Sequence, residues 1–412
     1  MFMGKKSIVF VTQPLVCGGI EKSLLAVLDS LPPDKFNVTV LLTERSGELL
    51  PYVPSWVNVE EVPLVPMDRF EIKCGRKQAL VYSLKHFQWL HAMRMLWARF
   101  CWKLFGTSWI DYNAKIVEEM VGRINLNREL QQFDYAFAYA GNMLCGLIVR
   151  NLIEAPVKAI WCHDETAVGR VGEKSWKSLL STFTHRFATR QLCERLNAVR
   201  PTEIPLFEEM PLFLDSWLAY RMADDGDGFT DGYRGLRILT VGRLAVQKGI
   251  DNAILIASRM KADGYDFRWY IIGEGDEREK LERQIAESNI GECFILLGQF
   301  INPYPFFKAC DIYAQPSRWE AYCITIAEAR MFNKPIVCTD FVGAREQLID
   351  GKTGLIVPLN DNDSFYAALK RLFKDKTRRE SLSIALSETS ADSVITARNR
   401  WWRLLGMDES WQ

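Results

Sequence analysis

Short β-branched runs alternate with helical patterns along most of this 412-residue chain. Strands that alternate with helices indicate parallel α/β units, because each helix returns the chain to the start of the next strand. In the second half, the expected strands are Arg237–Val241, Arg268–Ile272, Phe294–Leu297, Asp311–Gln315, Pro335–Thr339 and Leu355–Val357. In the first half, they are Ser7–Thr12, Asn37–Leu42, Tyr135–Tyr139 and Lys158–Cys162. The pattern predicts two doubly wound, Rossmann-like domains.

The length of the chain exceeds what one ordinary hydrophobic core supports, so two domains of about 200 residues are expected. We expect residues 1–221 to form the first domain, 235–385 the second, and 386–412 a final helix. Glycines and aspartates break all periodicity in the expected linker, residues 222–234. Within it, Asp225-Gly226-Asp227 has the spacing of a metal-binding DxD motif, but a solvated turn explains it, and no metal site is predicted.

The composition is that of a soluble globular protein with no net charge, and no nucleic-acid partner is expected. The ten cysteines are scattered singly, which favours reduced thiols and a cytoplasmic protein over disulfides or a zinc site. The apolar stretch near the N-terminus ends at Gln13-Pro14, too short for a signal peptide, and no run of eighteen apolar residues follows. We therefore expect a chain that is neither secreted nor membrane-spanning.

The segment 69–128 differs from its surroundings. It holds eleven lysines and arginines against four acidic residues, interleaved with tryptophans and phenylalanines. Such a segment can lie at the surface of a bilayer, with its rings at headgroup level and its cations near anionic lipid. Equally, the aromatic residues can be domain core and the cations its solvated face. Peripheral membrane contact through this segment stays open at this stage.

Two carboxylates stand eight residues apart in the stretch Pro316–Arg330. An expected strand leads into it, so Glu320 falls in a turn and Glu328 on the following helix. If the stretch is helical, the two acids are separated by about 12 Å, the reach of a nucleotide sugar from ribose to hexose. The N–H groups of Cys323, Ile324 and Thr325 lie between them at a helix start, where a diphosphate can bind. The alternative is an ordinary helix with two surface acids.

A second motif, Val241-Gly242-Arg243-Leu244, follows the strand Arg237–Val241, and Gln247-Lys248-Gly249 opens the next helix. Arg243 and Lys248 can both reach the crevice at the carboxyl end of this strand, where open α/β sheets bind ligands. Two cations there suit a diphosphate, although a solvated pair is an equal alternative. Gly273 and Gly298 end the following strands, where tight turns explain them and close approach to a ligand is a secondary interpretation.

In the first half, Gly18-Gly19 follows the first strand and opens a helix. Its spacing is not that of the dinucleotide fingerprint, which counts against a nicotinamide enzyme, but two glycines permit a loop near a phosphate or an acceptor. His163 is the one histidine at the carboxyl end of an expected strand, beside Asp164-Glu165. A buried structural histidine is the alternative.

Taken together, these motifs resemble those of the GT4 family of retaining glycosyltransferases, which have the GT-B fold. The resemblance is strongest from about 237 to 358 and weakest across 52–129. Two further matches, Gly343…Glu346 and Gly351-Lys352-Thr353-Gly354-Leu355, extend it. The GT-B fold implies two Rossmann-like domains that face each other across a cleft, with a C-terminal helix that returns to the first domain.

The resemblance also implies roles for these residues. The second domain would bind a nucleotide sugar and the first an acceptor, with no metal and no further cofactor. Arg243 and Lys248 would neutralise the diphosphate, Glu328 would bind the ribose, and Glu320 the hexose. His163 would contact the hexose near its anomeric carbon. The chain departs from the family at Tyr322-Cys323, where many members have a glycine, and at Arg345, whose target the sequence does not name.

The sequence therefore predicts a metal-independent hexosyltransferase of cell-surface polysaccharide synthesis, such as that of capsule or lipopolysaccharide. Its donor would be a nucleotide-diphosphate sugar, with UDP as the expected nucleotide, and its acceptor a glycan or a lipid-linked oligosaccharide. The alternatives are another GT-B enzyme, such as a sugar-nucleotide epimerase or a phosphorylase, and a non-enzymatic scaffold that binds nucleotide sugars.

Overall fold

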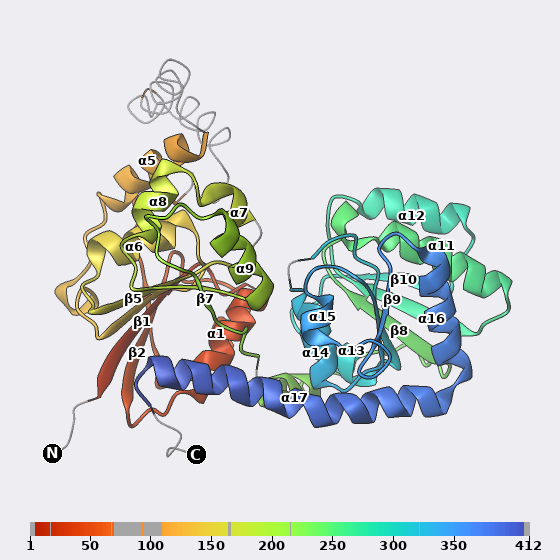
Figure 1. Ribbon diagram of the computed structural model, residues 1–412. Coiled ribbons are helices and arrows are strands. Elements are labelled where there is room, and N and C mark those ends of the chain that lie inside the picture. Colours follow the sequence, from red (N-terminus) through yellow and green to blue (C-terminus); the bar gives the residue numbers. More distant parts are fainter. Residues whose placement is uncertain are drawn as a thin grey trace. The chain divides into compact units, whose positions relative to one another are not determined.

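The computed structural model describes residues 5–16, 18–66, 68–69, 93, 109–163, 166–214, 216–320 and 322–407. The chain divides into two units, Met1–Pro211 and Leu212–Gln412, and a parallel sheet forms the centre of each (Figure 1). The division falls ahead of the expected linker at 222–234. Most of the basic aromatic segment 69–128 lies outside the described residues. Among the described helices, none has the length and apolar character needed to cross a bilayer.

Seven strands form the sheet of the first unit, in the order β3-β2-β1-β4-β5-β6-β7. They are β1 (Lys6–Thr12), β2 (Phe36–Leu42), β3 (Asn58–Glu61), β4 (Tyr135–Ala138), β5 (Val157–Trp161), β6 (His185–Ala188) and β7 (Glu208–Glu209). The described helices are α1 (Gly19–Ser30), α5 (Trp109–Val121), α6 (Met143–Leu152), α7 (Thr166–Arg170), α8 (Lys174–Leu180) and α9 (Arg190–Val199), with short 3-10 turns at Leu50–Tyr52 and Arg128–Leu130.

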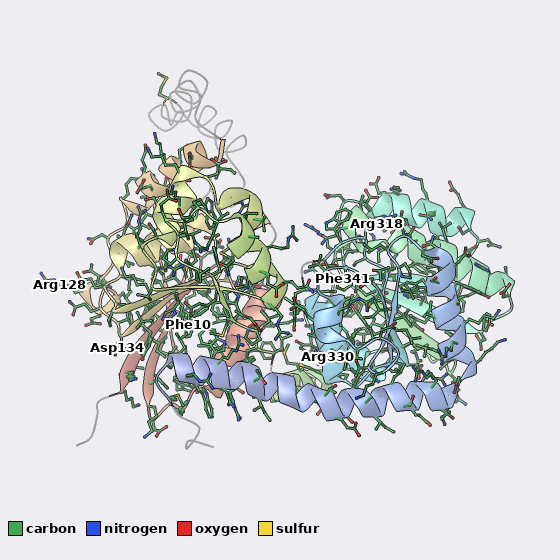
Figure 2. All side chains as sticks on the ribbon, in the orientation of Figure 1. Phe10, Arg128, Asp134, Arg318, Arg330 and Phe341 are labelled. Atoms are coloured by element: carbon green, nitrogen blue, oxygen red, sulfur yellow. The ribbon has the colours of Figure 1, made fainter. Side chains whose placement is uncertain are left out.

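Successive side chains of β1 point to opposite faces of this sheet, and they pack in the core on each side. Val9 and Val11 join the core cluster that includes α6 and α8. Phe10, labelled in Figure 2, lies fully buried on the other face. Its ring stacks on Phe137 at 5.0 Å between centroids. The chain proceeds outward from β1 through β2 to β3 and then returns to β4 on the other side of β1. The topological switch point therefore lies between β1 and β4.

The sheet of the second unit has six strands in the order β10-β9-β8-β11-β12-β13. They are β8 (Leu236–Val241), β9 (Phe267–Ile272), β10 (Phe294–Gly298), β11 (Ile312–Gln315), β12 (Ile336–Thr339) and β13 (Leu355–Val357). The helices are α10 (Ser216–Asp224), α11 (Ile250–Ala262), α12 (Arg278–Glu287), α13 (Tyr304–Ala309), α14 (Ile324–Met331), α15 (Ala344–Gln347), α16 (Asn362–Lys374) and α17 (Lys376–Leu404), with a 3-10 turn at Val246–Lys248.

Helices cover both faces of this second sheet. Figure 1 shows α11, α12 and α16 on one side of it and α13 and α14 on the other. The switch point lies between β8 and β11, because the chain builds outward from β8 to β10 and then resumes at β11. The expected boundary at 385/386 falls inside the continuous helix α17, and its return to the first domain stays a prediction.

All ten expected strands form, and none of their ends is shifted by more than one residue. Two doubly wound parallel sheets, as predicted from the pattern, are thus confirmed. Three strands, β3, β6 and β7, were not predicted. Their sequences, Asn-Val-Glu-Glu, His-Arg-Phe-Ala and Glu-Glu, contain no β-branched run, so their strand conformation depends on pairing with the sheet.

Candidate active site

The predicted site residues of the second unit gather at the carboxyl ends of β8 and β11. These neighbouring strands pair in parallel, so the loops that follow them emerge at the same edge of the sheet. One loop carries Arg243 and Lys248, and the other carries Glu320. This edge is the topological switch point, where open α/β sheets bind their ligands.

Lys248 and Glu320 form a largely buried ion pair. The Nζ atom of Lys248 lies 2.5 Å from Oε1 of Glu320, and their side chains are only 16% and 9% exposed. Ser317 donates to the same oxygen at 2.9 Å, and the amide of Gln247 donates to Oε2 at 3.2 Å. Burial acts to lower the pKa of Lys248, but the charge of the Glu320 carboxylate and its hydrogen bond help to hold it above its ordinary value. The lysine therefore stays charged.

Arg318, labelled in Figure 2, ties the two loops together. Its guanidinium forms a bidentate pair with Asp251 at 2.8 and 2.7 Å and donates to the carbonyl of Val246 at 2.8 Å. At Gly249, φ is +63°, and a Cβ atom would overlap the carbonyl oxygen of Pro316. Only glycine allows the two loops to approach this closely.

A chain of buried hydrogen bonds connects the ion pair to the end of β11 and to the start of α14. Gln315, the last residue of β11, accepts a hydrogen bond from the hydroxyl of Tyr313 at 2.6 Å and donates to Ser317 at 2.8 Å. Its oxygen also accepts from Thr325 at 3.3 Å, at the start of α14. Sequence reasoning missed Gln315, Ser317 and Gln247, although a glutamine at the end of an otherwise apolar strand was an available signal.

The first turn of α14 contains the three predicted donor-binding positions, Cys323, Ile324 and Thr325. Cys323 adopts a left-handed conformation (φ +64°, ψ +79°), and no side chain caps the helix in the described part of the chain. Gln347 donates to the carbonyls of Tyr322 and Cys323 and so holds this turn. Burial, with the charge of Glu320, raises the pKa of the Cys323 thiol to about 12. The thiol is therefore neutral, and the turn presents backbone N–H groups.

Glu328 lies on α14 as predicted, with only 1% of its surface exposed. The hydroxyl of Tyr304, at the start of α13, donates to its Oε1 at 3.0 Å. Its predicted role toward the ribose stays a prediction. Arg345, whose target the sequence did not name, forms a bidentate pair with Asp340 at 2.9 and 2.7 Å.

The remaining predicted residues of this unit line the same edge. Arg243 is exposed and makes no ion pair with another described residue, and its charge acts on Lys248. Gly273 and Gly298 have φ values of +151° and +84°, and the N–H of Gly273 donates to the carbonyl of Gly298 at 2.8 Å. A Cβ atom on Gly273 would overlap the carbonyl of Gly242. Backbone geometry alone thus requires Gly273, and a ligand role for these two glycines stays a prediction.

In the first unit, the predicted residues meet at the carboxyl ends of β1, β4 and β5. His163 stacks on Trp161 with 5.1 Å between ring centroids, and its Nε2 lies 2.6 Å from the carbonyl of Tyr139. Because a carbonyl only accepts, Nε2 carries a proton. The hydroxyl of Tyr139 reaches Ser23 of α1 at 2.9 Å, which links His163 to the helix that Gly18 and Gly19 open.

Glu21, in the first turn of α1, was not singled out by sequence reasoning. Its side chain is 7% exposed and folds back over Gly18, where a Cβ atom would overlap the carboxyl group. Burial raises the pKa of this carboxyl group, and the charge of Lys22 only partly opposes the shift. The glycine loop therefore has a buried acid beneath it, which the motif Gly18-Gly19 alone does not reveal.

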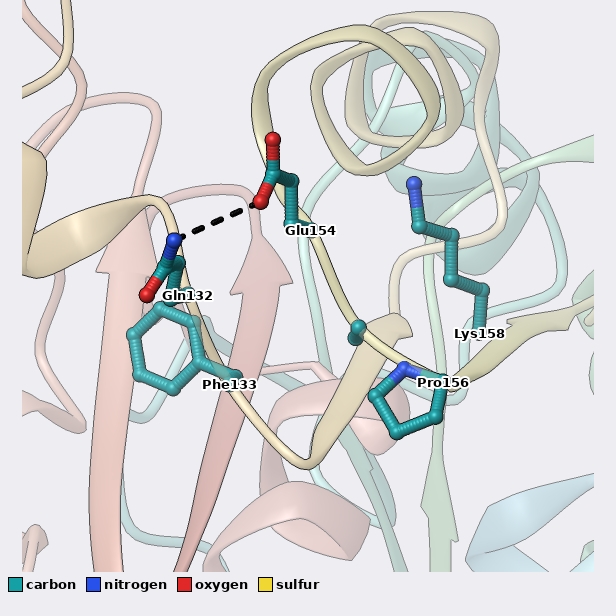
Figure 3. A pocket seen from close by; sticks show the side chains of 6 residues that line it. Gln132, Phe133, Glu154, Pro156 and Lys158 are labelled. Atoms are coloured by element: carbon teal, nitrogen blue, oxygen red, sulfur yellow. Dashed lines mark hydrogen bonds between the residues drawn. The ribbon is translucent and has the colours of Figure 1, made fainter.

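A cavity of about 540 Å³ lies at the opposite end of this first sheet (Figure 3). It is lined by Gln132, Phe133, Glu154, Ala155, Pro156 and Lys158. Lys158 is near the start of β5, whereas His163 follows its end, so the cavity does not belong to the predicted site. Within the described residues, no group of three histidine, cysteine or acidic side chains has a metal-binding arrangement.

Comparison with solved structures defines the fold class. The chain superposes on the UDP and glucose complex of Alr3699/HepE from Anabaena with a TM-score of 0.66 and 14% identity, over 97% of this chain and 99% of that one. This likeness, together with the two parallel sheets, confirms a two-domain GT-B fold.

The family model for glycosyl transferases group 1 matches residues 234–387. An N-acetylgalactosaminyltransferase of Campylobacter jejuni, which acts on a diphospho-undecaprenol-linked disaccharide, is 35% identical over 41% of this chain and 46% of its own length. The amylovoran biosynthesis glycosyltransferase AmsK of Erwinia amylovora is 28% identical over 34% of this chain and 36% of its own length. The chain thus matches less than half the length of these relatives. The matched residues lie in the second unit, and these likenesses support a GT4-like glycosyltransferase, as the sequence motifs predicted.

Proposed function

We propose that this protein is a retaining hexosyltransferase of cell-surface polysaccharide synthesis. It transfers a hexose from a UDP-sugar to a glycan or a lipid-linked oligosaccharide. The observation that carries the proposal is the buried Lys248–Glu320 pair at the switch point, beside the exposed Arg243 and the uncapped start of α14. Two relatives support it, since their names describe glycosyltransferases of amylovoran synthesis and of an undecaprenol-linked acceptor.

The positive charges suit a diphosphate leaving group. As the bond from the anomeric carbon to the diphosphate breaks, negative charge develops on the leaving oxygen. Lys248, fixed by Glu320, provides a preorganised ammonium, and Arg243 adds a planar guanidinium with five donors. The N–H groups at the start of α14 add the partial positive charge of a helix N-terminus. These groups supply the charge that a metal supplies in other transferases, so we propose that no metal is required.

Glu320 is suited to hydrogen bonding rather than to nucleophilic attack. Its Oε1 accepts from Lys248 and Ser317, and its Oε2 accepts from Gln247. A carboxylate has about four acceptor positions, so one on Oε2 is left for a sugar hydroxyl. A carboxylate held by three donors is a weak nucleophile. Its position supports a reaction in which the acceptor attacks from the side of the leaving group, without a covalent glycosyl-enzyme.

The matched variants Lys248→Ala and Lys261→Ala test the proposal. Lys261 is also paired with a glutamate, Glu292, at 2.6 Å, but it lies on α11 away from the switch point. Turnover of UDP-hexoses, measured by release of UDP, should fall about 10²- to 10³-fold in Lys248→Ala and stay unchanged in Lys261→Ala. Chelation with EDTA should leave the wild-type rate unchanged. Equal rates in the two variants would exclude the assigned role of Lys248.

Thermal unfolding with UDP, GDP, ADP and CDP tests the choice of nucleotide. A ligand at 100 times its dissociation constant stabilises the folded protein by about 2.7 kcal/mol. UDP should raise the melting temperature by a few degrees, and the other nucleotides by less. A selective shift with GDP would replace UDP in the proposal. Turnover of a UDP-sugar with no acceptor present would favour an epimerase instead.

A further inference from the structure

Trp319 is exposed although it directly precedes the buried Glu320. Its exposed fraction is 53%, against 8% for Glu320, and it is the only tryptophan among the exposed large apolar side chains of the described residues. On the neighbouring loop, Val246 is 49% exposed. These two side chains, called here the apolar shelf, leave a large apolar surface in water at the edge of the sheet that binds the donor.

Hydrogen bonds fix the backbone of the shelf. The carbonyl of Trp319 accepts from the amide of Gln247 at 3.0 Å. The N–H of Arg318 donates to the carbonyl of Gln247 at 2.8 Å, and its guanidinium donates to the carbonyl of Val246 at 2.8 Å. The hydrogen bonds thus bring the backbones of these two loops together, and the side chains of Trp319 and Val246 both stay exposed. An indole on a fixed backbone has only two side-chain torsions to order when it binds a ligand.

The chemistry of the shelf fits a sugar ring. A pyranose has one face of C–H groups and a rim of hydroxyls, so an indole can cover the face while the hydroxyls stay in water or reach polar groups. The carboxylate of Glu320 is turned inward to Lys248, and the ring of Trp319 is turned outward. The donor groups therefore lie on the inner side of this loop, and the shelf lies on its outer side.

We propose that Trp319 is a specificity-determining residue that binds the acceptor sugar by stacking, with Val246 extending the contact. This inference rests on the proposed glycosyltransferase function and adds that the second unit itself contacts the acceptor. The shelf recognises the ring form of a pyranose and leaves the affinity for the nucleotide unchanged.

Saturation-transfer NMR tests the inference without turnover. The probes are methyl α-glucoside, methyl α-galactoside and methyl α-N-acetylglucosaminide, each with saturating UDP, and open-chain sorbitol, which lacks an apolar face. The proteins are the wild type, Trp319→Ala, Trp319→Phe and a control, Ile384→Ala, which changes another exposed residue (60%) of the same unit. Wild type and control should bind at least one pyranoside but not sorbitol. Trp319→Ala should bind that pyranoside about tenfold more weakly, and Trp319→Phe should restore most of the binding.

Three results with the sugar probes would overturn the inference. They are equal pyranoside binding in wild type and Trp319→Ala, equal binding of sorbitol, and no pyranoside binding to the wild type. A fall in UDP affinity in Trp319→Ala would also overturn it, because the ring would then belong to the donor site. The UDP-dependent melting shift of the wild type is measured on the same samples. If UDP does not raise the melting temperature, the result counts against the proposed function. If UDP raises it but Trp319→Ala binds the pyranoside as tightly as the wild type, the result counts only against the shelf.

Discussion

The two sheets present different chemistry at their carboxyl edges. In the second unit, oppositely charged side chains form ion pairs: Lys248 pairs with Glu320, and Arg318 pairs with Asp251. Among the described residues of the first unit, the edge includes the stacked rings of Trp161 and His163, the hydroxyl pair of Tyr139 and Ser23, and the buried Glu21. The same doubly wound architecture thus presents paired charges at the edge of one unit and stacked rings at the edge of the other.

This difference fits the roles that the family resemblance implies, in which the second unit binds the nucleotide sugar and the first unit contributes to the acceptor site. A diphosphate is the same in every nucleotide sugar, and fixed charges and helix N-terminal N–H groups suit it. Acceptors differ in shape and carry few charges on their sugar rings. Aromatic side chains and hydroxyl groups of a protein are suited to bind such sugars. The family model matches the unit with the charged edge, residues 234–387. The predictions below test whether the charged edge performs the chemistry and the aromatic edge adds to it.

The largest effect is expected for Glu320→Gln. The amide cannot neutralise Lys248, so a buried charge loses its partner, which typically costs about 3–5 kcal/mol. The rate of UDP-hexose turnover should fall at least 100-fold, and the melting temperature should fall as well. Glu292→Gln is the control, because this acid also pairs with a lysine but is 74% exposed. Unchanged turnover in Glu320→Gln would contradict the electrostatic account of the charged edge.

Gly249→Ala should separate the two loops of the charged edge. A left-handed alanine costs about 1–2 kcal/mol by itself, and here its Cβ also overlaps the carbonyl of Pro316. Gly264→Ala is a matched control, since its φ is +78° and no atom lies within 4 Å of the added Cβ. Urea denaturation should show a loss in free energy of unfolding at least twice as large for Gly249→Ala. Equal losses would mean that the close contact of the loops contributes nothing.

A smaller effect is expected for His163→Ala at the aromatic edge. If Nδ1 of His163 accepts one hydrogen bond from a sugar hydroxyl, its loss should reduce turnover about tenfold. His185→Ala serves as the control, because His185 lies on the same sheet but pairs with Glu208 at 2.9 Å. A His163 variant as active as the His185 variant would leave His163 with only a structural role.

The smallest effect is a pH dependence at Glu21. Burial raises its pKa in the folded state, so the folded protein binds the proton more tightly than the unfolded chain does. The stability contribution of Glu21 is therefore greatest below the unfolded pKa and decreases as the pH rises through the folded pKa. Glu21→Gln, which cannot ionise, should melt above the wild type at pH 8 and level with it at pH 4. The exposed Glu194→Gln should show no such trend.

Ten of the thirteen described strands could be predicted from the sequence because buried β-branched runs end at glycine or polar turns. The positions of Lys248, Glu320 and Glu328 relative to those strands followed directly. Their contact did not follow, because it depends on β8 lying beside β11, and the strand order is not encoded in periodicity. Gln315 and Ser317 were missed for the same reason, since their role appears only when α14 and the loop of Lys248 are in place.

The left-handed conformation of Cys323 shows how the chain accommodates the glycine that it lacks relative to the family. Many family members have a glycine near this position, and here a cysteine adopts the glycine-like φ of +64°. The carbonyls before and at this residue are held by Gln347, 24 positions farther along the chain, which stabilises the unfavourable conformation. No local signal in the sequence indicates that compensation.

The contacts that build the charged edge have a consequence for how the chain folds. Gln247 and Lys248 meet Glu320 across 73 and 72 residues of sequence, so no local segment contains the site. Closing a loop of that length is slow because it costs conformational entropy. The contacts that offset this cost form only once β8 and β11 have paired. The charged edge is therefore assembled late, with the central pair of strands, and a fragment that lacks either strand lacks the Lys248–Glu320 pair. If this edge binds the nucleotide sugar as we propose, binding requires that the second unit has completed its folding.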